Sequence, residues 1–103
     1  MRDATFDDLV NQSVVEAMSK ILGENTWRAI NFFFDTRTAA NHPDTFTRLL
    51  DRMFGLTSKV LQKSIAESLF AKVGAVTQIP NSIDLGWVMK VARGKSLNPL
   101  SLK

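Results

Sequence analysis

A chain of 103 residues has room for one small domain with a single core, and its 45% hydrophobic and 22% charged residues are typical of a folded globular protein. The chain has no cysteine and one histidine, which excludes a disulfide framework, a thiolate metal site and most histidine-based zinc sites. The net charge of +3 is mild, no apolar stretch approaches the roughly 20 residues that span a bilayer, and the first residues are too polar for a signal peptide, so we expect a cytoplasmic protein without membrane contact.

The first two predicted helices are amphipathic, and the second is the shorter. Thr5, with Asp8 three residues later, suits the N-cap of a helix that ends at Gly23 and buries Phe6, Val10, Val14, Ala17, Met18 and Ile21. Asn25 is expected to cap a second helix, whose apolar face holds Trp27, Ile30, Phe33 and Phe34. Phe32 cannot share that face, so it is either buried by a neighbouring element, which we favour, or exposed on an interaction surface.

A polar loop is predicted over residues 35–43, ending at the start of the third helix. Pro43 suits the first helical position, and His42 before it is predicted to be an N-cap or an exposed loop residue. The third helix ends at Gly55 and carries on its apolar side Phe46, Leu49, Leu50, Met53 and Phe54. The link that follows is so short that it predicts a sharp corner.

The segment 57–73 is the predicted central helix, with Thr57 or Ser58 as its cap and Gly74 after its end. About half of its surface is apolar, which predicts contacts with several neighbours, through Leu61, Ile65, Ala66, Leu69, Phe70 and Val73. Gln62 lies inside this face and is expected to reach solvent or a loop carbonyl.

The C-terminal part of the chain gives a mixed signal. Apolar residues alternate over residues 83–91 as in a strand, whereas Ser82 as a cap and Gly94 as a stop indicate a helix. We favour the helix, because the alternative, a short β-hairpin near residues 76–91, is marginal alone. Residues 95–103 are predicted to form a flexible tail after a single helical domain of residues 1–94.

The predicted fold class is therefore all-α, a compact bundle of four to five short helices. Its core is expected to contain Trp27, Phe33, Phe46, Leu50, Phe54, Leu61, Ile65 and Leu69. The sequence contains no Gly-rich phosphate loop, no His-Glu-x-x-His and no Gly-x-Ser-x-Gly motif. The one adjacent carboxylate pair, Asp7 and Asp8, points in directions about 100° apart on a helix. We therefore expect that the protein is not an enzyme and that it binds neither a cofactor nor a metal.

Charge is distributed unevenly along the chain. Residues 1–51 hold five bases and eight acids, and residues 52–103 hold eight bases and two acids. This asymmetry permits an alternative function, DNA binding, through Arg52, Lys59, Lys63, Lys72, Lys90, Arg93 and Lys95. Against it, Glu67 interrupts the basic side of the central helix, and no cluster of five or six bases occurs.

A family resemblance extends over residues 10–74. It rests on core and cap positions, namely Leu22, Gly23, Glu24, Ala29, Ile30, Phe33, Pro43, Asp44, Phe46, Leu50, Phe54, Gly55, Val60, Leu61, Ile65 and Leu69. This pattern resembles the Nitrosopumilus output domains, small helical domains of archaea associated with sensory and signalling chains. The resemblance implies a helical signalling fold and assigns no catalytic residue.

We therefore expect a non-catalytic protein-interaction or signalling (output-type) module, binding a protein partner or a second copy as a homodimer. The candidate interaction surface consists of Arg28, Phe32, His42 and Trp87. A second alternative is an apolar small ligand held between residues 32–34 and Met53 or Met89.

Overall fold

The structure is a computed structural model that describes residues 5–33, 37–74 and 84–97. It contains six α-helices and, after α2, the 3₁₀ turn η1 (Asn31–Phe33); the helices are α1 (Phe6–Leu22), α2 (Glu24–Ile30), α3 (Arg37–Asn41), α4 (Pro43–Phe54), α5 (Thr57–Val73) and α6 (Leu85–Leu97). No strand occurs in the described residues, which confirms the all-α class with more helices than expected. The hairpin alternative is wrong for residues 85–91, which are helical, and residues 76–79 lie outside the described part.

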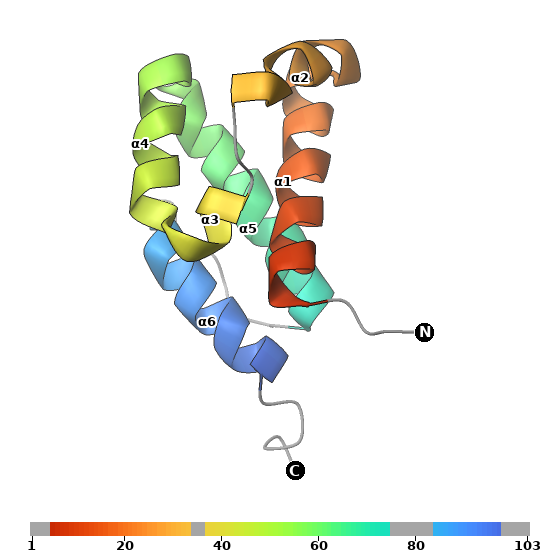
Figure 1. The fold of residues 1–103 in the computed structure, drawn as a ribbon, viewed down its shortest axis with the longest axis vertical. Helices are drawn as coiled ribbons and strands as arrows, with labels where there is room; N and C mark the ends of the chain where they lie inside the picture. The colour runs from red at the N-terminus through yellow and green to blue at the C-terminus, as the bar shows by residue number, and fades with distance from the viewer. Residues whose placement is uncertain (1–4, 34–36, 75–83, 98–103) are drawn as a thin grey trace.

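The helices form a bundle around α5 (Figure 1). α5 packs against α1, α4 and α6, as its wide apolar face predicts, and α3 lies between α1 and α4. α2 and η1 lie at the same end of the bundle as the corner between α4 and α5, and α6 lies at the other end (Figure 1). None of the described helices is long and apolar enough to cross a membrane.

The N-termini of α1 and α4 are capped by the residues that the sequence predicts. Thr5 and Asp8 form a capping box on α1, with the Thr5 Oγ1 accepting from Asp8 N at 3.1 Å and Asp8 Oδ2 accepting from Thr5 N at 3.2 Å. His42 is exposed and caps α4 through its carbonyl, which accepts from Phe46 N at 3.1 Å, so the prediction for His42 is confirmed. Asn25 is not a cap, because α2 begins at Glu24 directly after Gly23.

Two predicted boundaries are wrong because packing outweighs local propensity. Residues 37–41 are helical and bury Ala39 and Ala40 between α1 and α4, although their polar sequence predicts a loop. α6 continues through Gly94 to Leu97, so the stop at Gly94 and the start of the tail at residue 95 are also wrong. A glycine inside a helix costs only about 1 kcal/mol, which the burial of Leu85, Val88, Met89 and Ala92 on this helix exceeds.

The core contains most of the predicted residues. Trp27, Phe46, Leu50, Leu61, Ile65 and Leu69 are buried, whereas Phe54 is partly buried and the side chain of Phe33 lies outside the described set. The favoured burial of Phe32 is wrong, because η1 places this residue at the end of the bundle with its side chain 89% exposed.

Candidate interaction surface

The corner between α4 and α5 is closed by backbone hydrogen bonds. Gly55 has φ 57° and ψ −127°, a conformation that residues with a side chain rarely adopt. Its N–H donates to the carbonyl of Asp51 at 3.0 Å, and its carbonyl accepts from Ser58 N at 3.0 Å. The chain therefore reverses within Gly55 and Leu56, as the short link predicts.

A small polar network lies beneath this corner. The Ser58 hydroxyl donates to Asp51 Oδ1 at 2.6 Å, and Gln62 Nε2 donates to Ser58 Oγ at 2.9 Å and lies 3.5 Å from Asp51 Oδ1. Ser58 and Gln62 are buried. Two predictions are therefore wrong: neither Thr57 nor Ser58 caps α5 with its side chain, and Gln62 reaches neither solvent nor a loop carbonyl. The network joins the two helices and holds the corner rigid.

Large apolar side chains are exposed around the corner. Met53 in the last turn of α4 is 40% exposed, Leu56 in the link 87%, and Val60 in the first turn of α5 56%. The turn η1, which carries the exposed Phe32, lies at the same end of the bundle (Figure 1). We name these residues the apolar end. It holds four of the six large apolar side chains that are exposed in the described residues, so they are concentrated at one end and not scattered.

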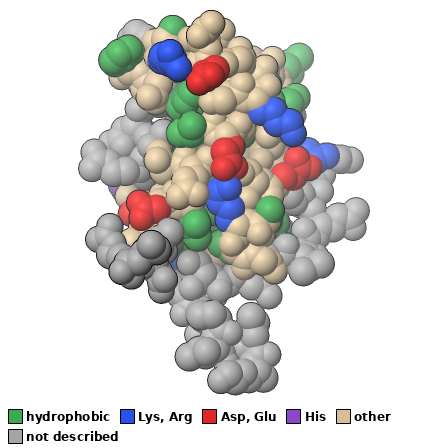
Figure 2. All heavy atoms as spheres, turned by 90° about the vertical axis from the view of Figure 1, so that its right-hand side faces the viewer, with side chains coloured by type: hydrophobic (Ala, Val, Ile, Leu, Met, Phe, Trp, Pro, Cys, Tyr) green, Lys and Arg blue, Asp and Glu red, His purple; other side chains and the backbone are tan. Residues whose placement is uncertain are grey.

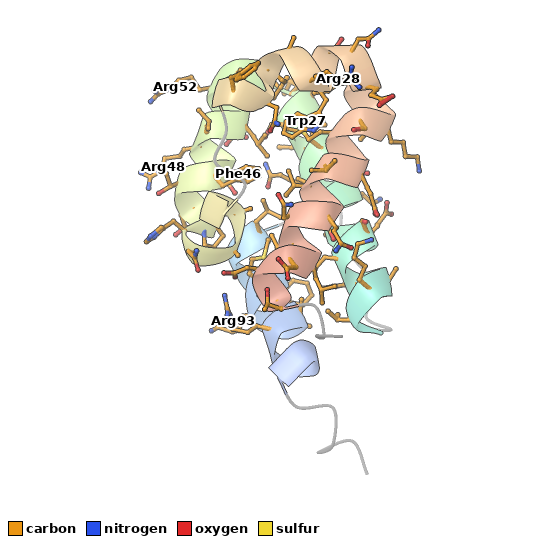
Figure 3. The ribbon with its side chains drawn as sticks, turned by 45° about the vertical axis from the view of Figure 1, so that its right-hand side comes forward. Trp27, Arg28, Phe46, Arg48, Arg52 and Arg93 are labelled. Atoms are coloured by element: carbon orange, nitrogen blue, oxygen red, sulfur yellow. The ribbon has the colours of Figure 1, made fainter. Side chains whose placement is uncertain are left out.

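Basic side chains flank the apolar end. Arg48 and Arg52 extend from α4 away from the bundle, whereas Trp27 and Phe46 point inward (Figure 3). The two arginines, with Thr45 and Leu49, line a shallow hollow of about 320 Å³. Lys59, the residue before Val60, is exposed. Among the described residues, neither these arginines nor Lys59 form an ion pair.

The structure separates the residues predicted for protein interaction. Phe32 and Arg28 lie at the same end, and Arg28 Nη2 pairs with Glu24 Oε1 at 3.2 Å. His42, at the start of α4, and Trp87, in the first turn of α6, lie away from that end. Trp87 packs edge-to-face on Phe70, with the ring centroids 6.1 Å apart. Of the apolar end, the sequence analysis placed Phe32 in the candidate interaction surface and Met53 in the ligand alternative, and it placed Leu56 and Val60 in neither.

The residues predicted for DNA binding do not form one face. Arg52, Lys59 and Lys63 lie near the α4–α5 corner, whereas Lys90 and Arg93 lie on α6 at the other end. Arg93 is held over the Phe6 ring, and Lys72 Nζ pairs with Glu16 Oε1 at 2.8 Å. The side chain of Lys95 lies outside the described set.

The side of the molecule formed by α1 and α5 is balanced in charge. Glu16 accepts from Lys72 and, at 2.7 Å, from the Ser68 hydroxyl, and these bonds lower the pKa of the Glu16 carboxyl. A hollow of about 310 Å³ beside this pair is lined by Glu16, Ala17, Lys20, Ser64, Glu67 and Ser68. Figure 2 views the side on which α1 lies in Figure 1, and there acidic and basic side chains lie next to one another. This face is typical of a solvated surface.

A further hollow, of about 480 Å³, lies between α4, α5 and α6 and is lined by Asp44, Thr47, Arg48, Gln62, Asp84 and Leu85. Asp84 Oδ1 accepts from Gly86 N at 2.8 Å, so this carboxylate caps α6. No group of three or more His, Cys, Asp or Glu suited to a metal ion occurs in the described residues. Met89 is buried in α6 and Phe32 lies at the opposite end, so these two side chains do not enclose a common ligand site.

Comparison with models of protein families, with curated proteins and with solved structures gave no match to this chain. The resemblance to Nitrosopumilus output domains therefore stays a prediction. The function has to be inferred from the side chains themselves. They provide a rigid corner with exposed apolar groups and cations beside them.

Proposed function

We propose that the protein is a non-catalytic interaction module that binds a protein partner through the apolar end. The observation that carries this proposal is the exposure of Met53, Leu56 and Val60 around a corner that a partly buried hydrogen-bond network holds in place. An apolar group on a rigid support loses little conformational entropy on binding, which favours its use as an anchor.

The magnitudes are consistent with a specific but modest affinity. Full burial of a side chain such as Phe32 or Leu56 contributes about 1.5–3 kcal/mol each. Association itself costs on the order of 4–15 kcal/mol. A partner must therefore cover most of the apolar end and also use the polar rim. A signalling role in the cytoplasm belongs to the same proposal and is supported by the resemblance to Nitrosopumilus output domains.

Affinity capture with matched variants tests the proposal. The immobilised wild type is compared, in an extract of the source cells, with Leu56→Ser/Val60→Ser and with Val15→Ser, which removes an exposed apolar side chain from α1. We expect a partner that the corner variant loses and the Val15 variant retains. Circular dichroism checks that all three chains keep their helices.

Self-association is measured in parallel, because a second copy also counts as a protein partner. Light scattering over a range of concentrations shows whether the wild type forms an oligomer and whether Leu56→Ser/Val60→Ser reverses it. If the wild type stays monomeric and all three proteins capture the same set, the proposal is wrong.

DNA binding is the second candidate, and it is favoured by the exposed side chains of Arg48, Arg52 and Lys59, which form no ion pair within the described part of the chain. Arg93 and Lys72 count against it, since both are engaged within the molecule. Titration with duplex DNA at low and high salt tests it. An affinity that falls steeply with salt supports DNA binding, and no binding at low salt excludes it.

A further inference from the structure

We propose, building on the proposed function, that the partner segment is an acidic amphipathic helix. Its apolar face covers the apolar end, and Asp or Glu side chains on its flanks pair with Arg48, Arg52 and Lys59.

On each side of the corner, a basic residue directly precedes the exposed apolar residue in the sequence. Arg52 precedes Met53, and Lys59 precedes Val60. Of the carboxylates near these bases, Asp51 accepts from Ser58 and Glu24 pairs with Arg28. Asp44 and Asp84 lie with Arg48 at the hollow between α4, α5 and α6, away from Arg52 and Lys59. A purely apolar segment placed here would partly desolvate these cations without replacing their water, which is unfavourable. Carboxylates on the partner remove that cost and form charge-assisted hydrogen bonds.

The spacing of the two arginines suits a helical partner. Arg48 and Arg52 are four residues apart on α4, about 6 Å along the helix axis, and both lie at the hollow that Leu49 also lines. Carboxylates four residues apart on a second helix have the same spacing. Two guanidinium–carboxylate pairs can therefore form at once when the partner lies along α4, and guanidinium groups bind carboxylates in a bidentate way.

Other occupants fit these charges less well. A symmetric dimer through the apolar end would bring Arg52 and Lys59 of one copy close to the same bases of the other, which is repulsive. Nucleic acid phosphates would pair with the arginines but would leave Leu56 and Val60 exposed to water. Each of these occupants is an outcome of the experiment below.

The experiment uses two synthetic amphipathic peptides of about 18 residues, or five helical turns. Both carry leucine along one face; the first has glutamate on the flanks at four-residue spacing, and the second has lysine at the same positions. Binding to the full chain is measured by fluorescence anisotropy of the labelled peptides. We expect the glutamate peptide to bind at least about 10-fold more tightly than the lysine peptide.

Variants of the protein locate the binding surface. We expect two variants, Arg48→Gln/Arg52→Gln and Leu56→Ser, to bind the glutamate peptide about 5–10-fold more weakly than the wild type does. Lys90→Gln, which removes an exposed base on α6, is the control and should leave the affinity unchanged. All four substitutions are on exposed side chains, so the fold is retained.

The inference is overturned if the two peptides bind equally or not at all, or if the arginine and Leu56 variants bind the glutamate peptide as the wild type does. It is also overturned if duplex DNA binds at these arginines in place of the peptide, or if light scattering shows a dimer that Leu56→Ser dissociates. If a protein is captured through Leu56 and Val60 but the glutamate peptide does not bind, the proposed function holds and the partner has a different chemistry. Corner variants without effect in both experiments contradict both proposals.

Discussion

The guanidinium of Arg93 lies over the ring of Phe6, 4.5 Å from the ring centroid, so one contact joins the last described helix to the first. Arg93 Nη2 also donates to the carbonyl of Ala40 at 3.3 Å. Arg93 thereby connects α6 with α1 and α3, and Phe6 is buried beneath it. A cation over an aromatic ring contributes about 0.5–2 kcal/mol, more as it is desolvated.

Arg93→Ala is therefore expected to lower the free energy of unfolding by about 1–2 kcal/mol. Lys90→Ala, an exposed base on the same helix, should change it by less than about 0.5 kcal/mol. Urea denaturation of Arg93→Ala, Phe6→Leu and the double variant measures the coupling between the two side chains. Strictly additive effects would show that the contact contributes nothing of its own.

The network under the corner gives a second double-variant prediction. Ser58→Ala removes both the donor to Asp51 and the acceptor for the buried Gln62 amide, and should cost about 1–3 kcal/mol. In that background the Gln62 amide keeps only its 3.5 Å contact with Asp51, and Gln62→Leu removes the amide. The double variant should therefore lose less stability than the sum of the two single losses. Thermal unfolding of the wild type, the two single variants and the double variant measures this difference. Strictly additive losses would contradict a coupled network.

Sequence periodicity predicted the fold well where one face of a long helix is buried. The apolar faces of α1 and α5 repeat at helical spacing, and Val10, Val14, Leu61 and Ile65 are all buried. Periodicity did not predict α3, because two small alanines packed between neighbouring helices leave no periodic signal in five residues. Contacts between segments distant in the sequence decide such short elements.

The candidate surface was harder to predict than the fold. Met53 shares the apolar periodicity of α4 with Leu50, yet only Leu50 lies where another helix covers it. Leu56 stands in a two-residue link whose direction no periodicity determines. Val60 lies on the outer side of α5, and that position was the one signal in the sequence that could have identified it as exposed. The sequence specifies which side chains are apolar, and the tertiary arrangement determines which stay uncovered.

Replacement of Gly55 and of Gly94 by alanine should change the stability of the fold in opposite directions. At Gly55 the positive φ strains any L-residue, so Gly55→Ala should destabilise by about 1–3 kcal/mol, although no atom lies within 4 Å of the added Cβ. Gly94 lies inside α6 with open space around it, so Gly94→Ala should stabilise by about 0.5–1 kcal/mol. Melting temperatures of the two variants test both signs, and a stabilising Gly55→Ala would contradict the observed corner.

The ion pair between Glu16 and Lys72 predicts a small loss of stability in acid. Hydrogen bonds from Lys72 and from Ser68 lower the pKa of Glu16 in the folded chain. The unfolded chain therefore takes up the proton at a higher pH, near the ordinary glutamate value of 4.5. The stabilisation is fully present above that pH and is lost as the pH falls through the lower pKa of the folded state. Because the Glu16 carboxylate is solvent-exposed, the contribution should be only about 0.2–1 kcal/mol.

The difference in free energy of unfolding between wild type and Glu16→Gln, measured by urea denaturation at a series of pH values, isolates this contribution. The advantage of the wild type should be constant above pH ~5 and should shrink below it. In a Lys72→Gln background the main donor to Glu16 is absent, so the same comparison should give a weaker pH dependence. High salt should also reduce the effect, since exposed charges are screened. A difference that grows as the pH falls would have the wrong sign and would exclude a lowered pKa for Glu16.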